Sequence, residues 1–198
     1  MLASGAGTNL QALLDAFGAG QDDVDIVAVA SDKSDAPALG RAEVAGVATA
    51  SFPRERWAGR AERDAAITAW LAAKEVELVV LAGYMALLDG AFVRRWAGRL
   101  INVHPSLLPA FAGMRAIEQA LEYGVALYGV TVHLVDEGVD TGPVLLQEAV
   151  GLPGARTIDE VHDALRPVEH RLLCTAVRAF AAGDARPDPD HPRRWRLS

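Results

Sequence analysis

The side chains of Asn102 and His104 close a short apolar segment, and their types and spacing suit the transfer of an acyl group. Residues two apart on a strand point to the same face, so both are expected at one place on a sheet. An amide N–H can donate to a developing oxyanion, and an imidazolium can donate a second hydrogen bond or a proton. The same spacing also fits a structural role, in which the histidine is buried and the asparagine closes a turn.

Asp140 is a third candidate, in an acidic and glycine-rich connection over residues 136–142. The glycines beside it permit close backbone approach and unusual dihedral angles. A carboxylate near His104 would stabilise the charged form of the imidazole, whereas a solvated carboxylate in a turn is the structural alternative. His133, in the apolar segment 129–135, either faces the same site or is a core histidine.

The start of the chain offers a candidate phosphate site. Segment 5–9, with two glycines before Thr8 and Asn9, precedes an expected helix over 10–17. Such glycines let backbone N–H groups approach an anion at a helix N-terminus. The segment is neither a dinucleotide fingerprint, because Leu10 replaces the third glycine, nor a P-loop. A tight turn capped by Thr8 or Asn9 is the structural alternative, and the strand before it is expected to be very short.

Alternating strands and helices are expected to position these residues. The expected strands cover residues 25–30, 77–83, 100–103, 129–135 and 143–150, and the expected helices cover 37–46, 60–74, 91–96, 116–123 and 156–181. Continuous apolar runs such as 77–83 are typical of parallel strands covered on both faces. Their alternation with helices indicates an α/β fold. The tail 184–198 has no helical period and is expected to be loosely attached.

Length and composition limit what the chain can be. Its 198 residues favour one domain, and 51% hydrophobic with 23% charged residues is typical of globular proteins. A net charge of -7 argues against nucleic acid as the main partner. No apolar run is longer than that at 78–82, which is too short for a membrane span, and no secretory signal is recognisable. With one cysteine, Cys174, expected in the core, and no zinc-ligand spacing among the histidines, a cytoplasmic protein without a metal is predicted.

These motifs together resemble a known family. The run Asn-Val-His-Pro-Ser-Leu-Leu-Pro at 102–109, followed by Gly-Val-Thr-Val-His at 129–133 and Asp-Thr-Gly-Pro-Val-Leu at 140–145, is similar to the signature of the folate-dependent formyltransferases. The loop 4–11 resembles that of the branch acting on glycinamide ribonucleotide, and the length fits this branch because others carry an additional domain.

The resemblance implies a fold and a division of the chain. The fold would be the three-layer, Rossmann-like α/β formyltransferase fold, a mostly parallel twisted sheet with antiparallel strands added in the C-terminal half. Residues 1–198 would form a single formyltransferase domain. Its phosphate-binding half would cover about 1–99, its catalytic and folate half about 100–182, and the loose tail 184–198.

The activity implied is direct transfer of the formyl group of 10-formyltetrahydrofolate to the amine of N1-(5-phospho-D-ribosyl)glycinamide, in purine biosynthesis. The implied enzyme is a monomer or homodimer that binds no nucleic acid, membrane or metal. One alternative is a related enzyme with another acceptor, either a different amine or water. Another is a nucleotide-binding module without catalysis, suggested by the turn at 5–7 and by Asp32.

The resemblance also implies roles for individual residues. The catalytic residues would be Asn102 and His104, which stabilise the oxyanion, and Asp140, which keeps His104 charged. The phosphate and ribose of the acceptor would be bound by Gly7, Thr8, Asn9 and Glu169. The folate would be bound by Arg60, Met85, Ala86, Leu87, Leu88 and Asn102. The chain departs from the usual family pattern at Ala86, where many relatives carry arginine, and at Ala112 and Arg115.

Overall fold

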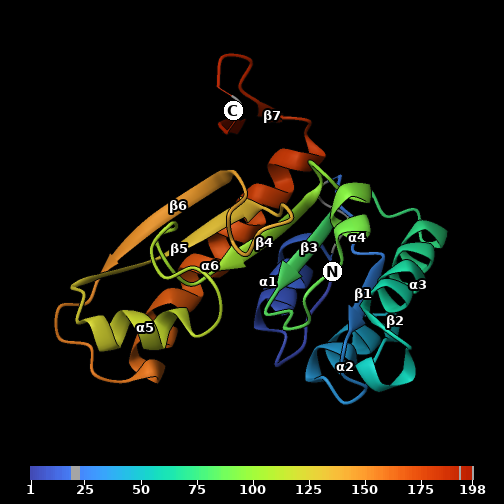
Figure 1. The fold of residues 1–198 in the computed structure, drawn as a ribbon, viewed down its shortest axis with the longest axis horizontal. Helices are drawn as coiled ribbons and strands as arrows, with labels where there is room; N and C mark the ends of the chain where they lie inside the picture. Colours follow the sequence, from blue (N-terminus) through green and yellow to red (C-terminus); the bar gives the residue numbers. More distant parts are fainter. Residues whose placement is uncertain (19–22, 192, 198) are drawn as a thin grey trace. The chain divides into compact units, whose positions relative to one another are not determined.

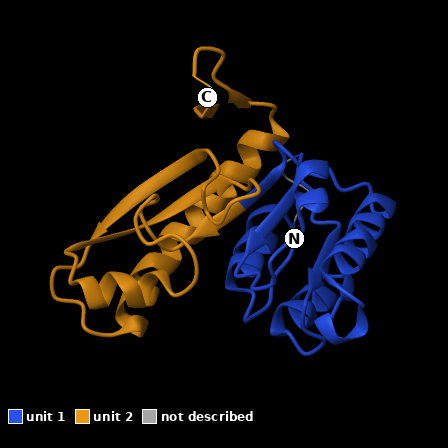
Figure 2. Cartoon of the chain, in the orientation of Figure 1, with its two compact units in different colours: residues 1–101 blue, residues 102–198 orange. Residues whose placement is uncertain are grey.

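The computed structural model describes residues 1–18, 23–191 and 193–197. The chain forms two compact units, residues 1–101 and 102–198 (Figure 2). Helices and strands alternate through most of the chain, which confirms the predicted α/β fold (Figure 1). Across the described residues, no helix combines the length and hydropathy needed to cross a bilayer.

The first unit is built on short parallel strands. Strands β1 (Ala28–Ser31) and β2 (Ala48–Ser51) pair in parallel. Leu2 forms parallel bridges to both β1 and β3 (Val79–Ala82), so the strand before the glycine loop is very short. All residues of β1 and β3 are buried, as their apolar runs predict. β2 was not predicted, because its small and polar residues, half-buried in the structure, show no apolar run.

The helices of the first unit begin where local sequence signals place them. They are α1 (Thr8–Phe17), α2 (Pro37–Val44), the 3-10 turn η1 (Arg54–Arg56), α3 (Arg60–Ala73) and α4 (Gly90–Arg95). Proline suits the first position of α2 because its fixed φ is helical and it lacks an N–H there. The carboxylate of Asp89 accepts from the N–H of Phe92 at 3.0 Å and so caps α4.

The second unit contains the antiparallel strands that the resemblance predicted. β4 (Leu100–His104) enters it at Asn102 and lies beside β5 (Leu127–Leu134), which pairs antiparallel with β6 (Val144–Gly151). The register of β5 against β6 shifts between Val132 and His133. Such an irregularity changes the direction of the side chains at the end of a strand. Here it lies just before the connection that carries Asp140.

Two helices and a hairpin complete the second unit. Helix α5 (Ala116–Tyr123) precedes β5, and the long α6 (Ile158–Ala181) packs on β5 and β6 (Figure 1). α6 begins with a capping box between Thr157 and Glu160.

The tail that was expected to be loose contains β7 (Ala185–Pro187) and β8 (Trp195–Leu197), which pair antiparallel. The indole of Trp195 lies 6.1 Å from the ring of Phe180, and β8 also contacts β6.

Candidate active site

The second unit brings Asn102, His104 and Asp140 together. β4 carries the first two side chains on one face, and the connection after β5 carries the third. Nδ1 of His104 lies 3.4 Å from Oδ2 of Asp140, and Nδ2 of Asn102 lies 3.4 Å from Oδ1 of the same carboxylate. His104 is 6% exposed. The cluster therefore places an amide and an imidazole against one carboxylate, which is a set suited to acyl transfer.

The backbone around Asp140 explains how its carboxylate reaches the cluster. Asp140 has a φ of 53°, a left-handed conformation that aspartate tolerates better than most residues. A Cβ on Gly142 would stand 1.8 Å from the carbonyl oxygen of Leu134, so only glycine lets the chain return this closely to the end of β5. The N–H of Gly113 donates to Oδ2 of Asp140 at 2.8 Å and holds the carboxylate from the other side.

The surroundings of Asp140 keep it ionised. Burial alone would raise the pKa of this carboxyl group. Hydrogen bonds and charges from neighbouring residues, the charge of His104 and the N–H of Gly113 among them, outweigh burial, so the pKa of Asp140 lies below its ordinary value. A carboxylate is therefore available to face the His104 ring at neutral pH.

The second ring nitrogen of His104 is held by a loop. Nε2 lies 2.9 Å from the carbonyl oxygen of Phe111, which can only accept a hydrogen bond. Both ring nitrogens therefore face acceptors, and the charged imidazole, which donates from both, fits this geometry. Phe111 and Arg115 have left-handed φ values of 53° and 62°. Arg115, one of the departures from the family pattern, is exposed and lies 3.7 Å from Glu118 of α5.

His133 joins the same cluster. Its side chain is 1% exposed, and Nε2 lies 3.1 Å from Nδ2 of Asn102 and 3.4 Å from Oδ1 of Asp140. Strand alternation had left open whether this histidine faces the site or the core, and the structure places it in both. The donor end of the Asn102 amide, which sequence reasoning assigned to an oxyanion, is directed at His133 and Asp140.

The candidate phosphate loop lies in the first unit. Gly7 precedes α1 with a φ of 73°, and a Cβ there would stand 2.8 Å from Ala38, so this turn requires glycine. No side chain caps α1, unlike the structural alternative in which Thr8 or Asn9 does so. Both residues lie in the first turn, where backbone N–H groups have no partner within the helix. The N-terminus of α1 can therefore accept an anion.

Asp32 has a structural partner in the first unit. The hydroxyl of Ser4 donates to its carboxylate and accepts from the N–H of Met85 at 2.8 Å. Asp32 thus fastens the start of the glycine loop to the end of β1, which accounts for a residue that otherwise suggested a nucleotide-binding module.

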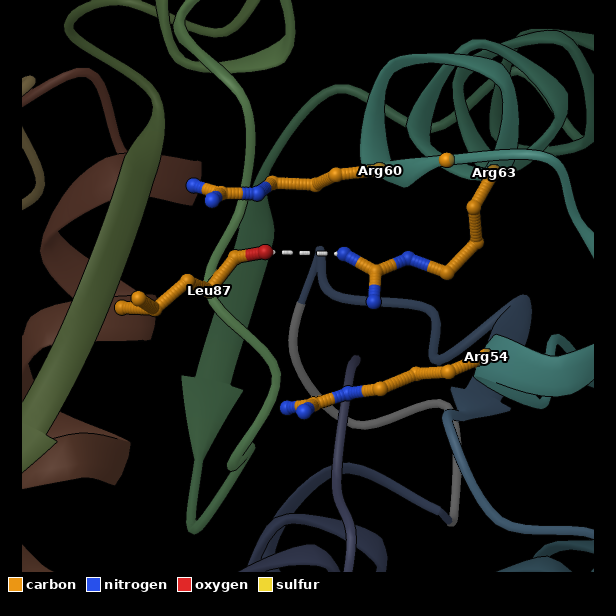
Figure 3. A pocket seen from close by; sticks show the side chains of 5 residues that line it. Arg54, Arg60, Arg63 and Leu87 are labelled. Carbon is orange, nitrogen blue, oxygen red and sulfur yellow. Dashed lines mark hydrogen bonds between the residues drawn. The ribbon is translucent and has the colours of Figure 1, made fainter.

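Three arginines line a cavity of about 270 Å³ in the first unit, together with Gly59 and Leu87 (Figure 3). The cavity thus unites Arg60 and Leu87, two of the residues predicted to bind folate. Nη2 of Arg63 donates to the carbonyl oxygen of Leu87 at 2.8 Å, and Nη2 of Arg54 donates to that of Met85 at 3.2 Å. In Figure 3 the guanidinium groups of all three arginines point toward the segment that carries Leu87. The cavity is therefore suited to an anionic group.

The other predicted site residues differ in exposure. Met85 and Leu87 are 54% and 60% exposed, whereas Ala86 is 5% exposed and Leu88 is half-buried. Glu169 lies on the buried face of α6 in the second unit, with 7% of its surface exposed. Within the described part of the chain, no three His, Cys, Asp or Glu side chains gather to hold a metal ion.

Comparisons with known proteins agree with this geometry. The formyl transferase family model matches residues 1–177. Phosphoribosylglycinamide formyltransferase of Mycobacterium tuberculosis is 44% identical over 184 residues, which are 91% of this chain and 83% of that protein. The crystal structure of glycinamide ribonucleotide transformylase 1 from Symbiobacterium toebii matches with a TM-score of 0.93 and 42% identity, over 99% of this chain and 91% of that one.

A longer relative shares the same region. Trifunctional purine biosynthetic protein adenosine-3 of Bos taurus is 40% identical over 186 residues, which are 94% of this chain but 18% of that protein. The chain therefore spans about a fifth of the length of this relative. The family model and these relatives cover most of the chain, its two units included, and the chain belongs to the formyl transferase family.

Proposed function

We propose that the protein transfers the formyl group of 10-formyltetrahydrofolate to the primary amine of N1-(5-phospho-D-ribosyl)glycinamide, a step of purine biosynthesis. The observation that carries this proposal is the contact of Asn102, His104 and Asp140 at the end of β4. The names of the relatives supply the acceptor, because these relatives are glycinamide ribonucleotide enzymes. We further propose that residues 1–198 act as one formyltransferase domain in the cytoplasm, as a monomer or homodimer.

The proposed chemistry needs no covalent enzyme intermediate. The acceptor nitrogen attacks the formyl carbon, and the formyl oxygen becomes an oxyanion that the charged ring of His104 stabilises by donating a hydrogen bond. The acceptor nitrogen then loses a proton, and the departing folate nitrogen gains one as the carbon–nitrogen bond breaks. Asp140 keeps the His104 ring charged through this sequence. The Nε2–H of that ring donates to the carbonyl oxygen of Phe111, so this hydrogen bond must break before Nε2–H can donate to the substrate.

The arginine cavity supports a folate co-substrate. 10-Formyltetrahydrofolate ends in a glutamate with two carboxylates, and guanidinium groups bind carboxylates through paired hydrogen bonds. Arg60 and Arg54 are exposed at the cavity, while Arg63 is buried. Ala86 contributes no charge at a position where many relatives carry arginine. Arg54 donates to the carbonyl oxygen of Met85, the residue before Ala86, and so supplies a cation beside that position.

The acceptor would be held through its phosphate and ribose. The backbone N–H groups and hydroxyl of the segment Gly7, Thr8 and Asn9 offer hydrogen bonds to a phosphate at the start of α1, and the helix dipole favours that charge. The carboxylate of Glu169 would accept from ribose hydroxyls.

A formyl-transfer assay tests the proposal. The protein is incubated with both substrates, and formylglycinamide ribonucleotide and formate are measured separately by mass spectrometry. Transfer by the parent chain, lowered by about 10²–10³ in His104→Ala, supports the proposal. His162→Ala, an exposed histidine on α6, is the matched control and should leave the rate unchanged. Formate release without a formylated amine would assign a hydrolase instead. The absence of both products would refute formyl transfer to this acceptor.

A further inference from the structure

The buried ring of His133 contacts the Asn102 amide. Nε2 lies 3.1 Å from Nδ2 of Asn102, and Nδ1 lies 2.8 Å from the carbonyl oxygen of Leu134. The side chain is 1% exposed, so neither nitrogen has an alternative partner in bulk water. The hydrogen on each ring nitrogen, or its absence, must therefore suit the protein groups that this nitrogen faces.

The Leu134 contact determines the tautomer of this ring. A carbonyl oxygen can only accept, so Nδ1 of His133 carries the hydrogen. In the neutral ring Nε2 is then a bare acceptor, and it accepts from Nδ2 of Asn102. A charged ring would instead direct a second N–H at Oδ1 of Asp140, 3.4 Å away, and would leave the closer Nδ2 of Asn102, 3.1 Å away, facing another donor.

The tautomer in turn determines the direction of the Asn102 amide. Rotating that amide by half a turn would place Oδ1 against the bare Nε2 of His133 and the carboxylate of Asp140, so three acceptors would meet. With Nδ2 facing these groups, Oδ1 is the other end of the amide. Among the described residues no group donates to that oxygen, and Asn102 is half-buried.

We propose that His133 is a positioning residue that makes Asn102 present an acceptor, Oδ1, to an N–H donor. Given the function proposed above, on which this inference rests, that donor is the amine that attacks the formyl group. A hydrogen bond from this amine to Oδ1 would aim the nitrogen lone pair at the formyl carbon. The oxyanion then depends on His104, and His133 acts on the reaction only through Asn102.

Two variants separate this role from simple packing. In His133→Gln the side-chain oxygen can reach the Nε2 position and accept from Asn102. In His133→Asn the amide reaches only the Nδ1 position, so it keeps the Leu134 contact and leaves Asn102 without its acceptor. We expect kcat to fall less than about tenfold in the first variant and about 100-fold in the second.

The comparison of the variants can overturn the inference. Asparagine is one methylene shorter than glutamine, so a role in packing alone predicts losses of kcat that follow the loss of stability in urea in both variants. Losses of kcat that follow stability in this way, or a greater loss in His133→Gln, would therefore refute the assignment.

Nuclear magnetic resonance of the ring nitrogens tests the inference without substrate. In the ¹⁵N-labelled protein the His133 signals should show a protonated Nδ1 and a bare Nε2 at neutral pH. The opposite tautomer, or a charged ring, would overturn the inference even if formyl transfer is confirmed. If formyl transfer fails, this spectrum still decides whether His133 orients the Asn102 amide.

Discussion

The charge of a single residue, Asp140, links the candidate site to pH. Its carboxylate accepts from Gly113 and faces His104, and these contacts help to keep its pKa below the ordinary value in spite of burial. A depressed pKa means that the ionised group stabilises the folded chain above the ordinary aspartate pKa of about 3.9. That contribution disappears as pH falls through the lower pKa of the folded state.

Asp140→Asn should therefore lose stability relative to the parent at pH 7 but not in strong acid. Asparagine also tolerates the left-handed backbone at this position, so the change removes charge with little backbone strain. Urea unfolding of both proteins between pH 7 and 3 measures the difference in the free energy of unfolding. The difference should shrink below about pH 4. A difference that is the same at every pH would contradict the lowered pKa.

Sequence reasoning found the side chains of the cluster but not the backbone groups that hold them. Asn102, His104 and Asp140 follow from residue type and motif. The carbonyl of Phe111 and the N–H of Gly113 could not be predicted, because every residue has these groups and only the path of the loop selects two of them. His133 stayed open because strand alternation specifies a face, not what covers that face.

At the scale of elements, one buried ion pair ties α3 to the segment after β3. Nη2 of Arg63 lies 2.6 Å from Oδ1 of Asp64, and the two side chains are 4% and 0% exposed. Asp64 also accepts from the N–H of Asp89 at 2.7 Å, and Arg63 donates to the carbonyl of Leu87. This pair therefore supports both the arginine cavity and the start of α4.

Asp64→Ala should be strongly destabilising. It leaves the buried guanidinium of Arg63 without its carboxylate, a type of change that costs about 3–5 kcal/mol. Urea denaturation gives the free energy of unfolding. Glu62→Ala removes an exposed carboxylate from the same helix and serves as the control, with a much smaller loss expected. Equal losses in the two variants would show that the buried pair has no special part in stability.

The C-terminal hairpin contacts the connection that carries Asp140. Nη2 of Arg193 donates to the carbonyl oxygen of Thr141 at 2.6 Å. One hydrogen bond contributes about 0.5–1.5 kcal/mol. If all of this free energy serves to orient the reacting group, removing the bond lowers the rate by about two- to tenfold. Arg193→Ala should lower kcat within that range and leave the KM for folate unchanged. Arg194→Ala, the adjacent exposed arginine, is the control, and equal kcat in both variants would contradict a role for the hairpin.

Elements with strong apolar patterns were predictable, and those without were not. The buried runs of β3 and β5 and the amphipathic α3 appear close to their predicted positions. β2 was missed because alanine, threonine and serine show no apolar run. The hairpin of β7 and β8 was missed because such short strands depend on contacts outside the strands themselves, with Phe180 and with β6.

At the scale of the whole molecule, the proposed tasks are divided between two units of the chain. The first carries the helix terminus proposed for phosphate and the arginine cavity proposed for folate. The second carries the groups proposed to make and break bonds. The net charge of -7 gives no general attraction for two anionic substrates, so their binding must depend on these local positive groups. Changes at one of them should therefore affect one substrate alone.

Thr8→Asp tests this separation. A carboxylate in the first turn of α1 repels a dianionic phosphate by about 1–4 kcal/mol per charge pair at 4 Å, while the helix dipole tolerates it. Calorimetric titration should show affinity for the glycinamide ribonucleotide lowered at least about 100-fold and affinity for a folate analogue unchanged. Thr8→Ser keeps the hydroxyl and should bind both ligands as the parent does. If Thr8→Asp binds the ribonucleotide normally, the phosphate is recognised elsewhere, whereas weaker binding of both ligands would show that the two sites are coupled through the fold.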